Sequence, residues 1–77
     1  MSPKDVQSFI TAEPFRPFTI YLTDGSSHRV TLPDHAFVMA GVVYVGMEPD
    51  QDNMPTYAKH INLRQITRIE AAMPDAA

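Results

Sequence analysis

The sequence contains no cysteine, so neither a disulfide nor a cysteine-based metal site stabilises the chain. Its 77 residues are enough for one small domain. A domain of about 60 residues buries only about 60% of the surface that its unfolded chain exposes. Close packing or oligomerisation must then supply stability, and we expect self-association.

Long apolar runs are also missing. No stretch approaches the roughly 18–20 apolar residues of a transmembrane helix. The N-terminus has one lysine and lacks the apolar segment of a signal peptide. Together with the absence of cysteine, these features predict a cytoplasmic protein with no membrane partner.

Positive charge is scarce. Nine acidic and six basic residues give a formal net charge of −3. Proteins that bind nucleic acid usually carry a basic excess or a basic stripe. The net negative charge disfavours RNA as a partner but does not exclude a local basic patch.

Signatures of catalysis are absent as well. The sequence has no serine in a nucleophile elbow, no P-loop and no dinucleotide-binding fingerprint. The carboxylates between Glu13 and Glu70 show no spacing that marks an acid–base pair. We therefore expect a protein that is not an enzyme and needs no cofactor.

The most informative segment that is present is 18–34, FTIYLTDGSSHRVTLPD, which is typical of a β-hairpin. Asp24-Gly25 is a strong turn signal, because glycine takes positive φ without steric cost. Apolar residues alternate with other residues along both arms and define one buried face: Phe18, Ile20, Leu22, Val30 and Leu32.

The N-terminal residues 2–11 predict a short helix. Ser2 and Asp5 form a capping box, with Pro3 at the first helical position. Three apolar residues fall at helical spacing and form one stripe, which must pack on the sheet: Val6, Phe9 and Ile10.

The remaining segments indicate further strands. The run at 42–47, VVYVGM, is apolar on both faces and predicts a central strand. Other predicted elements are an extended connection at 13–17, a short extended run at 37–40, a strand at 57–63, a 3₁₀-like turn at 62–65, a final strand at 66–70 and a flexible tail at 71–77.

These elements predict one mainly β domain over residues 1–77, with a helix at 2–11 and a sheet at 18–70. About five short antiparallel strands form a strongly bent sheet or a small barrel, because closure removes exposed edges. The predicted core comprises Phe9, Ile10, Phe18, Ile20, Leu22, Val30, Leu32, Val43, Val45, Ile61, Ile66 and Ile69.

The stretch PFRPFTIYLTDG at 14–25 and the closing pattern L-x-x-I-x-x-I-E at 63–70 resemble a family of small uncharacterised bacterial proteins. Members of that family often have His-Pro where this chain has Leu32-Pro33. The resemblance covers most of the chain and implies a shared fold, but it implies no activity.

A second resemblance is to Sm-like proteins of the Hfq type, small β-barrels that form rings and bind RNA. It rests on the element order, on Ile20-Tyr21-Leu22, on Asp24-Gly25 and on Lys59-His60. Ser26-Ser27 departs from the apolar-basic pair of that family. The resemblance implies RNA contacts at Tyr21 on one face of a ring and at Lys59-His60 on the other.

The basic residues of the last third suggest a local surface for single-stranded RNA, with tyrosines available for base stacking. Its candidate members are Tyr21, Tyr57, Lys59, His60, Arg64 and Arg68. The alternative, which we favour, is that these residues are solvated and balance the acidic segment at 48–55.

No metal site is predicted. His28, His35 and Asp34 converge only if the strand bends at Pro33, and locally hydrogen-bonded histidines are the simpler interpretation. The acidic segment 48–55 lacks the spacing of a calcium loop, and its prolines favour a mobile connection.

The function that these observations favour is a non-catalytic cytoplasmic module that binds itself or another protein through sheet edges or the helix face. The alternative is an Sm-like ring that binds RNA.

Overall fold

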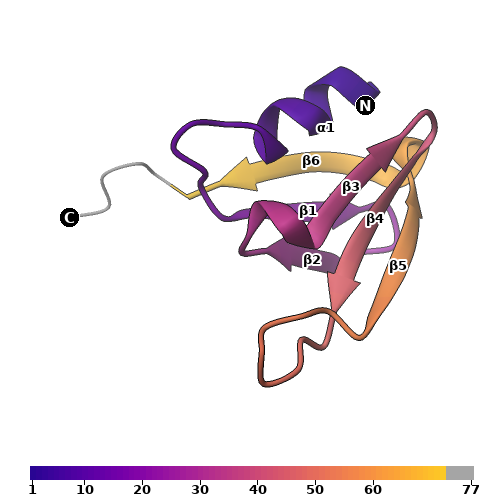
Figure 1. The fold of residues 1–77 in the computed structure, drawn as a ribbon. Coiled ribbons are helices and arrows are strands. Elements are labelled where there is room, and N and C mark those ends of the chain that lie inside the picture. The colour runs from indigo at the N-terminus through magenta and orange to yellow at the C-terminus, as the bar shows by residue number, and fades with distance from the viewer. Residues whose placement is uncertain (73–77) are drawn as a thin grey trace.

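The computed structural model describes residues 1–72 and is mainly β, as the sequence predicts (Figure 1). In that range one short helix precedes six strands. The elements are α1 (Pro3–Ile10), β1 (Phe18–Leu22), β2 (Ser27–Val30), β3 (Ala36–Met39), β4 (Val42–Met47), β5 (Tyr57–Asn62) and β6 (Ile66–Ala71), with 3₁₀ turns at Pro33–His35 and Leu63–Gln65.

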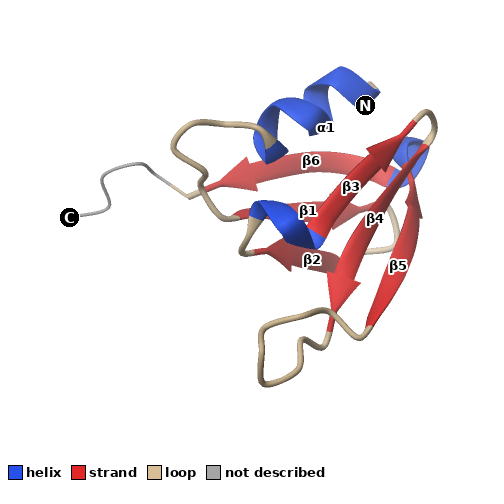
Figure 2. Cartoon of the chain, viewed as in Figure 1, coloured by secondary structure: helices blue, strands red, loops and turns tan. Residues whose placement is uncertain are grey.

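The strands form two three-stranded antiparallel sheets, in the orders β2-β1-β6 and β3-β4-β5 (Figure 2). We call them the first and the second sheet. β4 is central in the second sheet, which confirms the prediction for 42–47. Within residues 1–72 no strand ladder joins the two sheets. The prediction of one bent sheet or a closed barrel with about five strands is therefore corrected.

Two 3₁₀ turns explain this division. The turn Pro33–His35 separates β2 from β3, and the turn Leu63–Gln65 separates β5 from β6. Proline lacks the N–H that a ladder needs, and 3₁₀ backbone cannot continue a strand. At each turn the chain leaves one sheet and enters the other, so the extended run predicted at 37–40 becomes a strand of the second sheet.

The helix begins as its sequence predicts. Ser2 Oγ accepts a hydrogen bond from the Asp5 backbone N–H at 3.2 Å, and the Asp5 carboxylate accepts one from Ser2 N at 3.3 Å. Val6 is fully buried, and the Phe9 ring centroid lies 5.6 Å from that of Phe18. The helix lies beside β6 and β3, where it covers the interior between the sheets (Figure 1). In the described residues no helix is long and apolar enough to span a membrane.

The core lies between the facing sides of the two sheets. Its fully buried side chains are Val6, Phe18, Ile20, Val30, Val43 and Val45. Ile61 and Ile66 are also buried, while Phe9, Ile10, Leu22 and Ile69 are half-buried against this core. Leu32 was predicted to be buried but is 38% exposed, because it lies after the end of β2, in the break between the sheets. Buried Leu63 was not predicted.

The C-terminal boundary also differs from the prediction. Ala71 belongs to β6, and the Ala72 backbone N–H donates to the Pro17 carbonyl at 2.8 Å. The first residue assigned to a flexible tail is thus part of the sheet. The rest of that prediction, at 73–77, lies outside the described residues.

Candidate functional site

The outer side of the second sheet carries a row of aromatic rings. Val43 and Val45 of β4 point into the core, so Tyr44 between them points outward. Strand register places Phe37 of β3 and His60 of β5 on either side of Tyr44. The ring centroids of Phe37 and Tyr44 lie 6.4 Å apart, and those of Tyr44 and His60 lie 4.6 Å apart. We call Phe37, Tyr44 and His60 the aromatic row.

This outer face is apolar and exposed. Phe37 is 61% exposed and Met39 is 53% exposed, although both lie in a strand. Register gives the face no Lys, Arg, Asp or Glu: its positions are Phe37, Met39, Val42, Tyr44, Gly46, Ala58, His60 and Asn62. Aromatic and methionine side chains without charges are typical of the centre of a protein–protein interface.

A shallow groove of about 410 Å³ extends from the aromatic row towards the loop that joins β4 to β5. Its lining combines the outer face with residues of that loop: Asp34, His35, Ala36, Phe37, Tyr44, Gly46, Met54, Pro55, Tyr57 and Ala58. Met54 is 62% exposed and Tyr57 is 48% exposed. The groove therefore adds further apolar surface to the aromatic row.

Hydrogen bonds hold the loop 48–56 in place. Asp50 Oδ1 accepts from the backbone N–H of Asp52 at 2.9 Å and of Met54 at 3.0 Å. His35, only 7% exposed, donates from Nε2 to the Asn53 carbonyl at 3.0 Å. In this structure an aspartate turn shapes the loop and a buried histidine ties it to the sheet, while the mobility of this connection stays a prediction.

Gly46 allows this loop to lie against β4. A Cβ at Gly46 would lie 2.5 Å from Pro55 Cγ and 3.3 Å from the His35 carbonyl oxygen. A methyl group there must displace Pro55 and, with it, one wall of the groove.

Gly46→Ala is accordingly expected to lower the free energy of unfolding by about 1–3 kcal/mol. Urea unfolding measures the change. Gly41→Ala is the matched control, because a Cβ at Gly41 meets nothing within 4 Å, and we expect a change within about 0.5 kcal/mol. Equal effects of the two substitutions would contradict the account of the loop.

Negative charge lies at one point of the groove lining and in the adjoining loop, without a basic counterpart in the lining. Asp34 is exposed and lines the groove, and the loop contributes Glu48, Asp50 and Asp52. Across residues 1–72 the structure contains one ion pair, Arg68 with Glu70, so none of these four carboxylates is paired with a cation. The groove has no lysine or arginine in its lining.

Tyr57 shares this electrostatic environment. Its hydroxyl donates to Glu48 Oε2 at 3.3 Å. Desolvation, followed by the neighbouring Glu48 charge, raises the pKa of Tyr57.

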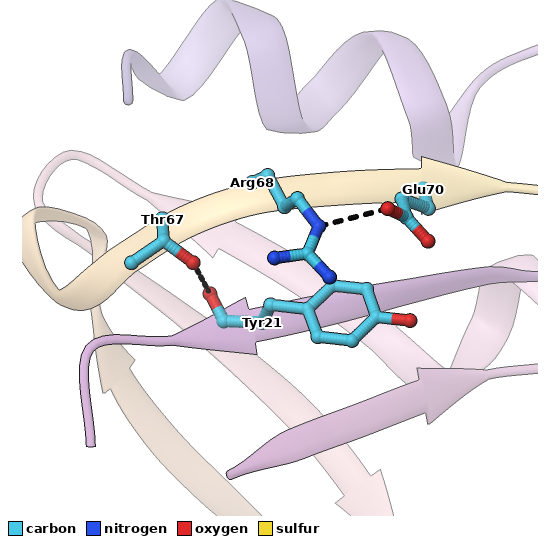
Figure 3. A network of polar contacts seen from close by, with 4 residues as sticks. All are labelled: Tyr21, Thr67, Arg68 and Glu70. Carbon is cyan, nitrogen blue, oxygen red and sulfur yellow. Dashed lines mark hydrogen bonds and ion pairs between the residues drawn. The ribbon is translucent and has the colours of Figure 1, made fainter. Parts of the chain in front are cut away.

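The predicted RNA-contacting residues are divided between the sheets. Tyr21 and Arg68 lie next to each other on the outer side of the first sheet, with Arg68 Cζ 3.9 Å from the Tyr21 ring centroid (Figure 3). Arg68 Nε also donates to Glu70 Oε2 at 2.8 Å. The guanidinium thus covers one face of the ring, and its charge is balanced by a carboxylate.

The other candidates lie elsewhere. Tyr57, Lys59 and His60 belong to β5, and Arg64 lies in the turn Leu63–Gln65. Adjacent residues of a strand point to opposite sides, so Lys59 and His60 do not share a face. A second groove of about 280 Å³ separates β5 from the β1–β2 turn and is lined by Leu22, Asp24, Ser26, Lys59, His60, Ile61, Asn62 and Gln65.

This second groove contains charges of both signs. Hydrogen bonds from the Ser26 hydroxyl and backbone lower the pKa of Asp24, which keeps its carboxylate ionised opposite Lys59. The groove therefore has no excess of positive charge for a phosphate backbone.

The three candidate metal-binding residues point to different surroundings. His28 pairs with Ile20 in the first sheet, while the His35 ring is bonded to Asn53 and Asp34 lines the first groove. Between residues 1 and 72 no three histidines or carboxylates are grouped in a way that holds a metal ion.

His28 provides a pH dependence that can be measured. Partial burial, followed by the positive charge of Lys59, lowers the pKa of His28 in the folded protein below that of the unfolded chain. As the pH falls through the unfolded value of about 6.5, the unfolded chain binds the proton more readily, so the folded state loses stability. The loss is complete below the folded pKa.

We therefore expect His28→Gln to reduce the fall in unfolding free energy between pH 7 and about pH 5. Urea titrations of both proteins at the two pH values measure this difference. An unchanged fall in the variant would show that His28 does not contribute to the acid sensitivity.

Comparison of the chain with protein-family models, with curated proteins and with solved structures finds no match. The resemblances to the small bacterial family and to Sm-like proteins stay predictions.

The exposed face of the second sheet was not predicted as a site. Phe37 and Met39 alternate with Ala36 and Val38, so both sides of β3 are apolar in sequence. The sequence alone does not show which side of this strand faces the core. The pairing with β4 shows it, because Val38 lies opposite Val43, which points into the core.

Proposed function

We propose that the protein is a non-catalytic protein-interaction domain that binds a partner through the outer face of its second sheet and acts in the cytoplasm. The observation that carries this proposal is the aromatic row, whose rings lie on an exposed face without Lys, Arg, Asp or Glu. The lack of cysteine supports the cytoplasmic location.

Energetic considerations support the same face. Aromatic side chains supply much of the binding energy at protein interfaces, because each buries a large apolar area with few rotatable bonds. Within residues 1–72 no element covers Phe37 and Met39, which are 61% and 53% exposed, whereas Val43 and Val45 on the inner side of the same sheet are fully buried. A partner would remove this surface from water.

The sheet is also a rigid support. β4 pairs with β5 over its whole length and with β3 from Val42 to Val45, so the positions of Phe37, Tyr44 and His60 are fixed by backbone ladders. A preformed surface loses little conformational entropy on binding. β5 forms a ladder only with β4 among the described strands, which leaves an edge beside the face.

Selection of random short peptides on the full chain tests the proposal. We expect peptides that are enriched on the wild-type protein and on Tyr21→Thr, but not on Phe37→Thr. Both variants remove an aromatic ring from the outer side of a strand, so the comparison separates the two sheets. Equal enrichment on all three proteins, or none on any, would contradict the proposal.

A further inference from the structure

We infer that the partner segment is extended and basic, and that one of its lysine or arginine side chains occupies the groove beside Phe37, Tyr44 and Tyr57. This inference rests on the proposed function and names the chemistry of the occupant.

The groove combines the two groups that recognise an organic cation. One phenylalanine and two tyrosines, Phe37, Tyr44 and Tyr57, line it, and the ring faces of these residues attract ammonium and guanidinium groups. Asp34 adds an exposed carboxylate to the same lining. Ala36, Gly46, Pro55 and Ala58 complete the lining with small or apolar surface that suits the aliphatic stem of a lysine or arginine.

The charge of the chain itself leaves this groove without a cation. All six lysines and arginines lie outside its lining, at Lys4, Arg16, Arg29, Lys59, Arg64 and Arg68. Glu48, Asp50 and Asp52 in the adjoining loop add negative charge that no ion pair among residues 1–72 compensates. A basic partner is complementary to this surface, and complementary charge raises both specificity and the rate of association.

The same charges disfavour the other occupants. A second copy packed through the same face would offer no lysine or arginine to these unpaired carboxylates, because the outward positions of the sheet carry none. The phosphates of RNA would meet the same carboxylates, and the face has no lysine or arginine to pair with them.

An extended conformation fits the shape of the surface. The uncharged face continues from the groove past Tyr44 to Met39, Val42 and Asn62, in register across the three strands. An extended segment can place one side chain in the groove and later ones on this continuation, because its side chains project at regular intervals.

The peptides enriched on the wild-type protein test the inference directly. We expect them to contain lysine or arginine next to apolar residues. Their affinity for Asp34→Asn should be about fivefold or more below that for the wild type. Glu13→Gln is the matched control, because it also removes one negative charge but lies in the connection between α1 and β1, outside the groove. The peptides should bind Glu13→Gln as tightly as they bind the wild type. Higher salt should weaken their binding to the wild type.

The outcomes separate the inference from the proposed function. Enriched peptides that are neutral or acidic, yet are lost on Phe37→Thr, would overturn the inference and leave the proposed function standing. Peptides that bind Phe37→Thr as well as they bind the wild type would overturn both the inference and the proposed function. A solution mass that rises with concentration and falls in Phe37→Thr would identify a second copy as the occupant. Binding of a short single-stranded RNA at low salt that Lys59→Ala abolishes would favour the ring hypothesis instead.

Discussion

Replacing Phe18 with alanine is expected to lower the free energy of unfolding by about 3–5 kcal/mol. Phe18 is fully buried in β1, and its ring contacts those of Phe9 at 5.6 Å and Phe15 at 6.0 Å between centroids. The substitution leaves a cavity at the point where the helix, the connection and the first sheet meet. For a domain whose total stability is about 5–15 kcal/mol, this is a large share.

Urea unfolding measures the loss, and Phe37→Ala is the control. Phe37 also lies in a strand but is 61% exposed, so its truncation should cost less than about 1 kcal/mol. Similar losses for the two phenylalanines would contradict the assignment of Phe18 to the interior and Phe37 to the surface.

Replacing Phe37 with threonine is expected to reduce the affinity for selected peptides by at least about tenfold. The aromatic ring lies at one end of the aromatic row and lines the groove. Threonine favours strand conformation, so the change removes binding surface while the sheet is preserved.

Two measurements separate binding from folding in this variant. Calorimetric titration gives the affinity, and urea unfolding gives the stability, which should stay within about 1 kcal/mol of the wild type. Tyr21→Thr on the first sheet should bind as the wild type does. A loss of affinity in Tyr21→Thr that equals the loss in Phe37→Thr would place the binding surface elsewhere.

The local elements could be predicted from the sequence because each has a short-range signal. The helix follows from the capping box of Ser2 and Asp5, and both hydrogen bonds are present. The hairpin follows from Asp24-Gly25, and Gly25 has the expected positive φ of 90°. The turn before the last strand follows from the spacing of its apolar residues, and Asn62 caps it through a bond from Arg64 N–H at 2.9 Å.

The division into two sheets depends on contacts between distant segments. Pro33 marks an interruption, but the sequence does not say whether the chain resumes in the same sheet. The partly buried hydrogen bond between His35 and Asn53, 18 residues apart, ties the chain after the interruption to the loop that joins β4 to β5. A local pattern does not contain such a contact, and Leu32 was placed in the core for the same reason.

The exposed face of the second sheet could not be predicted from the sequence for a similar reason. In β4, Val42, Val43, Tyr44 and Val45 are all suited to burial, so neither side could be chosen as the outer one. Only the pairing with β3 and β5 shows that Tyr44 lies between Phe37 and His60.

The most direct test of the binding surface is a backbone amide NMR titration of the full-length protein with the peptide most enriched on it. We predict shift changes concentrated in β3, in β4 and in the segment from Met54 to His60, with β1 and β6 little affected. Shift changes centred on Tyr21 and Arg68 in the first sheet would contradict the assignment of binding to the second sheet.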